Sequence, residues 1–125
     1  MGRCLIVEDY PGWVKIYQEI LAFSGCSIEV ADNLEDAVSM VKKKFDLYIC
    51  DGDFPLNVNE PCAYSGAFFD FYEKLVGVFP NPNLLLVSAS NGNVESARKM
   101  GIYSLDKNVN FQILKTQILD ALKVS

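Results

Sequence analysis

Six side chains able to bind a metal ion or a phosphoryl group lie at or just after the ends of hydrophobic segments: Glu8, Asp9, Asp51, Asp53, Ser88 and Lys107. The segment 45–55, FDLYICDGDFP, carries two of these carboxylates directly after a run of strand-favouring residues. Carboxylate oxygens suit a hard divalent cation, while a hydroxyl and an ammonium suit phosphoryl oxygens. This combination of residues could transfer a phosphoryl group to a carboxylate, with Asp51 as the nucleophile.

The carboxylates need a counter-charge if they converge. Two carboxylates about 4 Å apart repel by about 4 kcal/mol at an effective dielectric constant of about 20. Three of them without a cation would shift their pKa values or move apart. We therefore expect Mg²⁺ beside Glu8, Asp9 and Asp51, with Lys107 and Ser88 facing the same phosphoryl group.

Five short apolar segments alternate with five segments of helical periodicity, at about 25 residues per unit. The apolar segments are 3–7, 27–31, 47–50, 84–87 and 102–105. The alternation predicts a parallel sheet with right-handed crossovers. The carboxyl ends of parallel strands share one edge of the sheet, so the six side chains should meet there.

The segment Leu56–Ser65 is predicted to be a loop, because asparagines and Pro61 interrupt it. Such a loop is long for a connection between a strand and a helix, where about two to six residues are usual. Pro55 is expected to end the third strand. We expect the loop to pack over the aromatic helix 67–79, where Phe69 and Val76 lie outside the main apolar face, and to shape access to the site.

Two helices carry further local predictions. The run Lys42–Lys44 is expected to close the second helix, where positive charge is favourable. In the last helix, which Asn110 caps, Phe111 is expected to face inward with Leu114 and Ile118.

Composition narrows the class of protein. The chain has 125 residues, which suits one domain, and 11 basic against 16 acidic residues give a net charge of −5. That charge argues against nucleic acid as a direct partner, and no apolar run is long enough for a membrane span or a signal peptide. We therefore expect a cytoplasmic protein.

Zinc chemistry and histidine catalysis are not expected. The chain has no histidine, and no two of its four cysteines form a CxxC pair. Cys4 and Cys50 lie in apparent core strands and should be buried, whereas Cys26 and Cys62 lie in turn-like segments and could be exposed.

The sequence resembles the receiver domains of two-component response regulators over essentially its whole length. The matching segments are LIVED at 5–9, DLYICDGDFP at 46–55, VSA at 87–89, and Lys107. The resemblance implies one α/β domain over residues 1–125, with a flavodoxin-like, doubly wound five-stranded parallel sheet of order 2-1-3-4-5 and five helices.

The resemblance also implies roles for the residues. Asp51 accepts a phosphoryl group from a sensor histidine kinase or a phosphotransfer protein. Glu8, Asp9, Asp51 and the backbone carbonyl of Asp53 hold Mg²⁺, while Ser88 and Lys107 bind the phosphoryl group and report its arrival. Such a domain is no enzyme, and it signals by binding an effector protein, here unknown.

Three features depart from the family pattern. Asn108 stands where a proline usually follows the lysine, and Ser104 stands where the switch aromatic usually lies, with Tyr103 one position earlier. The segment after Pro55 is also longer than usual. The first two departures concern the output switch and leave the phosphorylation site intact.

Two other functions remain open at this point. A pseudo-receiver keeps the fold as a binding module without using the chemistry, and Mg²⁺ binding would separate it from a phosphoacceptor. The pair Asp51 and Asp53 also resembles the DxD motif of haloacid-dehalogenase-type phosphatases. In those enzymes, however, the motif follows the first strand and an acidic pair follows the lysine, whereas here the next acidic residue after Lys107 is Asp120.

Overall fold

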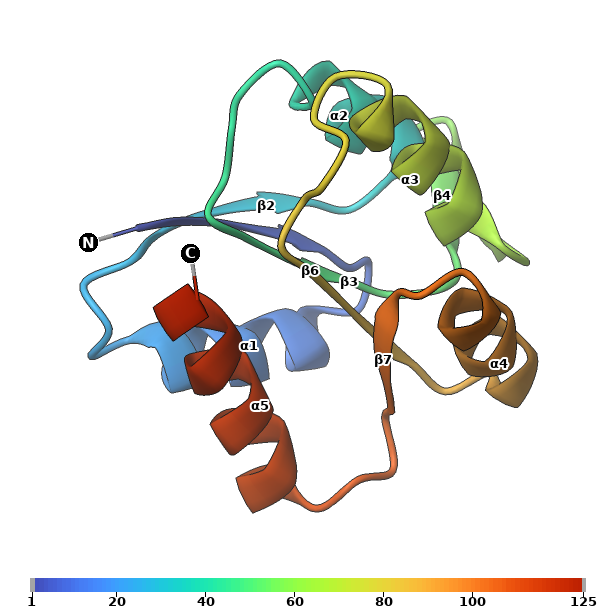
Figure 1. Cartoon of the computed structure of the whole chain (residues 1–125). Coiled ribbons are helices and arrows are strands. Elements are labelled where there is room, and N and C mark those ends of the chain that lie inside the picture. The colour runs from blue at the N-terminus through green and yellow to red at the C-terminus, as the bar shows by residue number, and fades with distance from the viewer. Residues whose placement is uncertain (1, 125) are drawn as a thin grey trace.

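A five-stranded parallel sheet forms the centre of the molecule (Figure 1). The computed structural model describes residues 2–124. The strands of the sheet are β1 (Arg3–Val7), β2 (Ser27–Ala31), β3 (Leu47–Cys50), β6 (Leu84–Ser88) and β7 (Tyr103–Asp106). They lie in the order β2-β1-β3-β6-β7, and every neighbouring pair is parallel. Counted along the chain within this sheet, that is the predicted order 2-1-3-4-5, so the predicted α/β fold is confirmed.

In the part of the chain that the structure describes, five helices cover the sheet. They are α1 (Pro11–Leu21), α2 (Leu34–Ser39), α3 (Ala67–Val76), α4 (Asn91–Lys99) and α5 (Phe111–Val124). Helices α1 and α5 lie on one face, α2 and α3 lie on the other, and α4 lies beside β7 (Figure 1). Within residues 2–124, no helix is long and apolar enough to cross a membrane.

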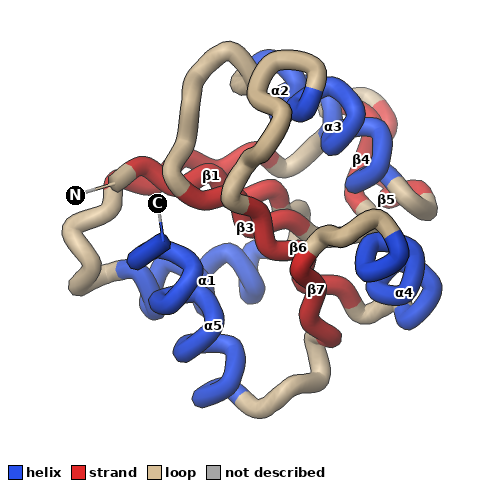
Figure 2. The backbone as a smooth tube through the Cα atoms, viewed as in Figure 1, coloured by secondary structure: helices blue, strands red, loops and turns tan. Residues whose placement is uncertain are grey.

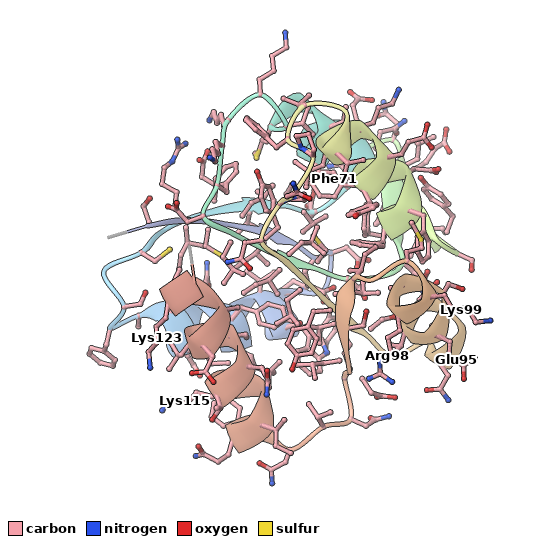
Figure 3. The ribbon with its side chains drawn as sticks, viewed as in Figure 1. Phe71, Glu95, Arg98, Lys99, Lys115 and Lys123 are labelled. Atoms are coloured by element: carbon pink, nitrogen blue, oxygen red, sulfur yellow. The ribbon has the colours of Figure 1, made fainter. Side chains whose placement is uncertain are left out.

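Successive strand residues point to opposite faces, which divides the hydrophobic core into two layers. Leu5 and Val7 of β1 pack in the layer under α2 and α3. Cys4 and Ile6 of the same strand pack in the layer under α1 and α5. Figure 3 shows Phe71 on the inner side of α3, where its side chain is fully buried. Strand β3 is buried on both faces, which explains its uninterrupted apolar sequence.

The segment predicted to be a loop folds into a β-hairpin instead (Figure 2). Its strands are β4 (Phe54–Asn57) and β5 (Glu60–Tyr64), which pair antiparallel. Pro55 therefore lies inside a strand, and the prediction that it ends one was wrong. Phe54 is fully buried, and the Tyr64 hydroxyl donates a hydrogen bond to Asp70 Oδ2 of α3 at 2.9 Å. The hairpin thus packs against α3, as predicted for the loop.

Helix α2 is shorter than predicted. It ends at Ser39, so Lys42–Lys44 follows the helix and does not close it. Hydrogen bonds between residues three apart, such as Val41 N to Val38 O at 3.2 Å, continue the chain as tight turns. These turns bury Val41 and Phe45 and return the chain to the start of β3. Helix α3 likewise ends at Val76, three residues before the predicted end.

Two predictions on side-chain exposure had different outcomes. Phe111 is 49% exposed, contrary to the prediction, because the first turn of α5 lies away from the sheet (Figure 1). The cysteines follow the prediction: Cys4 and Cys50 are buried, Cys26 is partly buried and Cys62 is exposed, all as free thiols.

Candidate functional site

Three residues of the site are held by backbone hydrogen bonds that extend the sheet beyond the ends of its strands. Asp51 N donates to Val7 O at 2.8 Å, and Glu8 N donates to the last carbonyl of β2 at 3.0 Å. Lys107 N donates to Ser88 O at 2.9 Å. The parallel register therefore brings these residues to one edge of the sheet, where the sequence predicted them.

Glu8, Asp9 and Asp51 form an acidic cluster. Each contributes a carboxylate oxygen that lies within 4.8 Å of the other two. The side chain of Glu8 is buried, Asp51 is 9% exposed, and Asp9 is partly exposed. Glu8 Oε2 accepts hydrogen bonds from the backbone N–H groups of Asp9 at 3.1 Å and Tyr10 at 3.2 Å. These contacts hold Glu8 inward while leaving the outer side of the cluster open to solvent.

Lys107 is the cation of the site. Its Nζ lies 2.7 Å from Glu8 Oε1 and 3.3 Å from Asp51 Oδ1, and it stands 5.1 Å from the centre of the Trp13 ring. One ammonium does not balance the carboxylates: burial and the charge of Asp51 raise the pKa of Glu8 to about 8, although Lys107 opposes the rise. An oxygen-only donor set with excess negative charge fits a hard divalent cation.

Ser88 lies beside the turn that follows the nucleophile candidate. Its side chain is buried, and its Oγ accepts a hydrogen bond from Ser90 N at 3.1 Å. Since the oxygen accepts this bond, the hydroxyl keeps its proton to donate to a ligand. A Cβ atom on Gly52 would lie 2.7 Å from Ser88 Oγ, so glycine is needed at this position for the two segments to approach.

The carboxylate of Asp53 is not part of the acidic cluster. Its Oδ1 accepts hydrogen bonds from Gly66 N at 2.8 Å and from Asn93 Nδ2 at 2.9 Å. Both donors draw the carboxylate towards the starts of α3 and α4. The predicted metal contact through the backbone carbonyl of Asp53 stays a prediction.

Asn93 is the residue that sequence reasoning missed. It is 7% exposed and contacts a residue 40 positions earlier in the chain. No local pattern signals such a contact, because it depends on how β3 and α4 are placed in the fold.

A cavity of about 290 Å³ borders the acidic cluster. It is lined by Asp9, Asp32, Asn33, Pro55, Asn57, Val58 and Pro61. The hairpin supplies four of these residues, so it forms one wall beside Asp9, in line with the prediction that this segment shapes access. A larger cavity of about 600 Å³, which includes Phe45, Tyr48 and Phe79 in its lining, lies at the opposite ends of the strands and contains no residue of the cluster.

Comparisons with known proteins bear on the fold. No protein-family model matches the sequence, and neither does any curated protein. A solved signal receiver domain of a putative LuxO repressor protein from Vibrio parahaemolyticus is similar, with a TM-score of 0.77 and 21% identity over 98% of this chain and 90% of that one. A CheY-like response regulator receiver domain protein from Methanospirillum hungatei JF-1 has a TM-score of 0.77 and 23% identity over 98% and 94%.

The chain has the fold of the response regulator receiver domains. The chemotaxis response regulator CheY4 of Vibrio cholerae shares this receiver fold, with a TM-score of 0.76 and 19% identity over 97% of this chain and 98% of that one. At such low identities the likeness establishes the receiver fold alone. The function therefore has to be argued from the side chains at the edge of the sheet.

Proposed function

We propose that this protein is a phosphoacceptor receiver domain in which Asp51 is phosphorylated with the help of Mg²⁺ and which signals by protein–protein interaction. The observation that carries the proposal is the convergence of Glu8, Asp9 and Asp51 within 4.8 Å, with Lys107 Nζ 3.3 Å from Asp51. The donors that we propose are a sensor histidine kinase or a phosphotransfer protein, and the target is an effector protein in the cytoplasm.

The proposed reaction transfers a phosphoryl group to Asp51. A carboxylate oxygen of Asp51 attacks the phosphorus and forms a phosphorus–oxygen bond, while the bond to the leaving group breaks and its electron pair departs with that group. With acetyl phosphate as donor, the leaving group is acetate. Lys107 can break its ion pair with Glu8 and form one with a phosphoryl oxygen instead. Ser88 can donate its hydroxyl proton to a phosphoryl oxygen.

Glu8, Asp9, Asp51 and the backbone carbonyl of Asp53 are the groups that would hold Mg²⁺. When bound, the ion supplies positive charge that offsets the charges of the carboxylates and of the phosphoryl oxygens. Glu8 and Asp51 are already fixed by backbone hydrogen bonds, so they need little reorganisation to receive it.

Intact mass spectrometry after incubation with Mg²⁺ and acetyl phosphate tests the proposal. We expect one added phosphate on the native chain, none on Asp51→Asn, and one on the control Asp120→Asn, which changes an exposed aspartate of α5. Phosphate that persists on Asp51→Asn would contradict the assignment of the acceptor.

A pseudo-receiver is the second candidate. Lys107 Nζ lies closer to Glu8, at 2.7 Å, than to Asp51, at 3.3 Å. The acidic cluster therefore already contains an internal ion pair, as a binding module without phosphoryl chemistry would. One solved structure with a TM-score of 0.78 is described as a redox sensor of streptococci that evolved from two-component response regulators, and this chain covers 52% of it. Absence of any phosphate on the native chain would favour a binding module of this kind.

A further inference from the structure

Asp53 is held between the starts of two helices. Its Oδ1 accepts one hydrogen bond from Gly66 N, at the beginning of α3, and one from the side chain of Asn93, in the first turn of α4. The amino-terminal end of a helix carries partial positive charge, which favours a carboxylate in this place. The side chain two positions after Asp51 is thus held by a donor from each helix, and it is not part of the acidic cluster.

Asn93 is fixed in place for this contact. Ser90 Oγ accepts a hydrogen bond from Asn93 N at 3.3 Å, which anchors the backbone of the residue. Its Nδ2 approaches the backbone of Gly52 so closely that a Cβ atom there would lie only 2.4 Å away. The contact with Asp53 therefore depends on the absence of a side chain at position 52.

We propose that Asn93 is a positioning residue that holds the Asp53 carboxylate out of the Mg²⁺ site. The inference rests on the proposed function, and it names a residue outside the acidic cluster that sets how many carboxylates the ion meets. With Asn93 in place, three carboxylates face the ion. Without its amide donor, Asp53 keeps only the hydrogen bond from Gly66 N and can turn to become the fourth.

A fourth carboxylate would affect Mg²⁺ binding and phosphoryl transfer in opposite directions, because the ion is positive and the phosphoryl group is negative. A fourth carboxylate attracts the cation and tightens Mg²⁺ binding. The same carboxylate repels an incoming phosphoryl group and slows its transfer to Asp51. A variant that merely loosened the site would weaken both steps, so the opposite signs distinguish positioning from loss of structure.

The contact also links the site to the surface. Because Asn93 belongs to α4, a protein that binds α4 and draws Asn93 away would change Mg²⁺ affinity. By thermodynamic reciprocity, Mg²⁺ would then change the affinity for that protein by the same factor.

Mg²⁺ titration of the unphosphorylated chain is the first test, with Trp13 as the reporter. Trp13 is the only tryptophan, and its ring lies beside Lys107, which contacts the acidic cluster. Asn93→Ala should bind Mg²⁺ about threefold to tenfold more tightly than the native chain. This is less than the full value of a hydrogen bond to a charged group, because Gly66 N still holds Asp53. Asp53→Asn and the double variant should both stay within about twofold of the native chain, because the neutral amide adds no charge.

The rate of phosphorylation by acetyl phosphate at saturating Mg²⁺ is the second test. It should fall by about threefold to tenfold in Asn93→Ala and recover in the double variant. Asn91→Ala, which removes an exposed asparagine two residues earlier on α4, is the matched control and should leave both measurements unchanged.

Three results would overturn the inference: no tightening of Mg²⁺ binding in Asn93→Ala, the same tightening in the double variant, or no Mg²⁺ binding by the native chain. If thermal unfolding shows that Asn93→Ala is not folded, Asn93→Ser replaces it, since the shorter hydroxyl also fails to reach Asp53. The titration needs no phosphorylation. A native chain that binds Mg²⁺ but gains no phosphate therefore refutes the proposed function while still testing Asn93.

Discussion

Replacing Gly52 with alanine should destabilise the folded protein strongly. The new Cβ atom would lie 2.4 Å from Asn93 Nδ2 and 2.7 Å from Ser88 Oγ, both shorter than a van der Waals contact. Both neighbours are side chains of buried residues, so neither can swing into solvent. The backbone at Gly52 does not have a positive φ, so the expected loss comes from crowding and not from backbone strain.

The size of the loss follows from two terms. Overpacking of a buried position costs about 1 to 3 kcal/mol. Displacing Asn93 to relieve the crowding removes a hydrogen bond to a carboxylate, worth about 1.5 to 3 kcal/mol. The more restricted unfolded chain of the alanine variant offsets about 0.5 kcal/mol. We expect a net loss of about 3 kcal/mol in the free energy of unfolding, which lowers Tm by about 10 °C in a domain of this size.

Thermal and urea unfolding of the purified variants measure this loss. Gly92→Ala is the matched control, because a Cβ there meets only Ser90 Oγ at 3.7 Å and alanine suits a helix, so it should leave Tm unchanged or raise it. In an Asn93→Ala background, Gly52→Ala should cost no more than half as much, because the closer of the two contacts is gone. A Gly52→Ala variant that melts within about 2 °C of the native chain would refute the reasoning.

Three further outcomes are expected. Tyr17→Phe should raise the free energy of unfolding by about 1 kcal/mol in urea unfolding, because the buried Tyr17 hydroxyl has no hydrogen-bond partner among the described residues; a loss of stability would reveal one. Asp9→Ala should weaken Mg²⁺ binding by at least about tenfold in the fluorescence titration, and equal affinity would place the ion elsewhere. The β4–β5 hairpin should show slowed amide hydrogen exchange at its paired positions, and Tyr64→Phe should speed it by breaking the bond to Asp70; fast exchange throughout the native hairpin would contradict the ordered strands.

The edge of the sheet that carries the site could be predicted because topology dictates it. Once apolar segments alternate with helical ones, the strands are parallel and their carboxyl ends coincide. Asp51, Ser88 and Lys107 each stand at such an end, so their convergence followed without knowledge of any contact. The residue types then limited the chemistry, since carboxylates and an ammonium suit cations and phosphoryl groups respectively.

The hairpin could not be predicted from local signals. Pro55 and Pro61 both disfavour a strand, and the asparagines between them favour turns. The strands form because Phe54 enters the core and Tyr64 binds α3, and such tertiary contacts override local preference. The short α2 has a similar origin, since burial of Val41 and Phe45 takes precedence over a longer helix.

The contacts of the Asp53 side chain could not be predicted from the sequence either. The sequence shows only that Asp53 follows Asp51 by two residues. The alternation of side chains along a strand then gives no more than an approximate direction for its carboxylate. Its actual partners, Gly66 and Asn93, lie 13 and 40 residues later in the chain. Asp53 contacts these two residues only because helices α3 and α4 pack beside the end of β3. No local sequence pattern indicates how those helices pack.

Strand β5 has a consequence for how copies of the protein behave in a crowded solution. A two-stranded sheet exposes an edge, and an exposed edge can pair with a neighbouring molecule and seed aggregation. Here Pro61 leaves a gap in the row of N–H donors along β5, and Glu60 brings a negative charge to the same strand. Two copies that met along β5 would lose a ladder hydrogen bond and bring like charges together. Pro61, which disfavours a strand when the sequence is read alone, thus also protects the hairpin against intermolecular sheet formation.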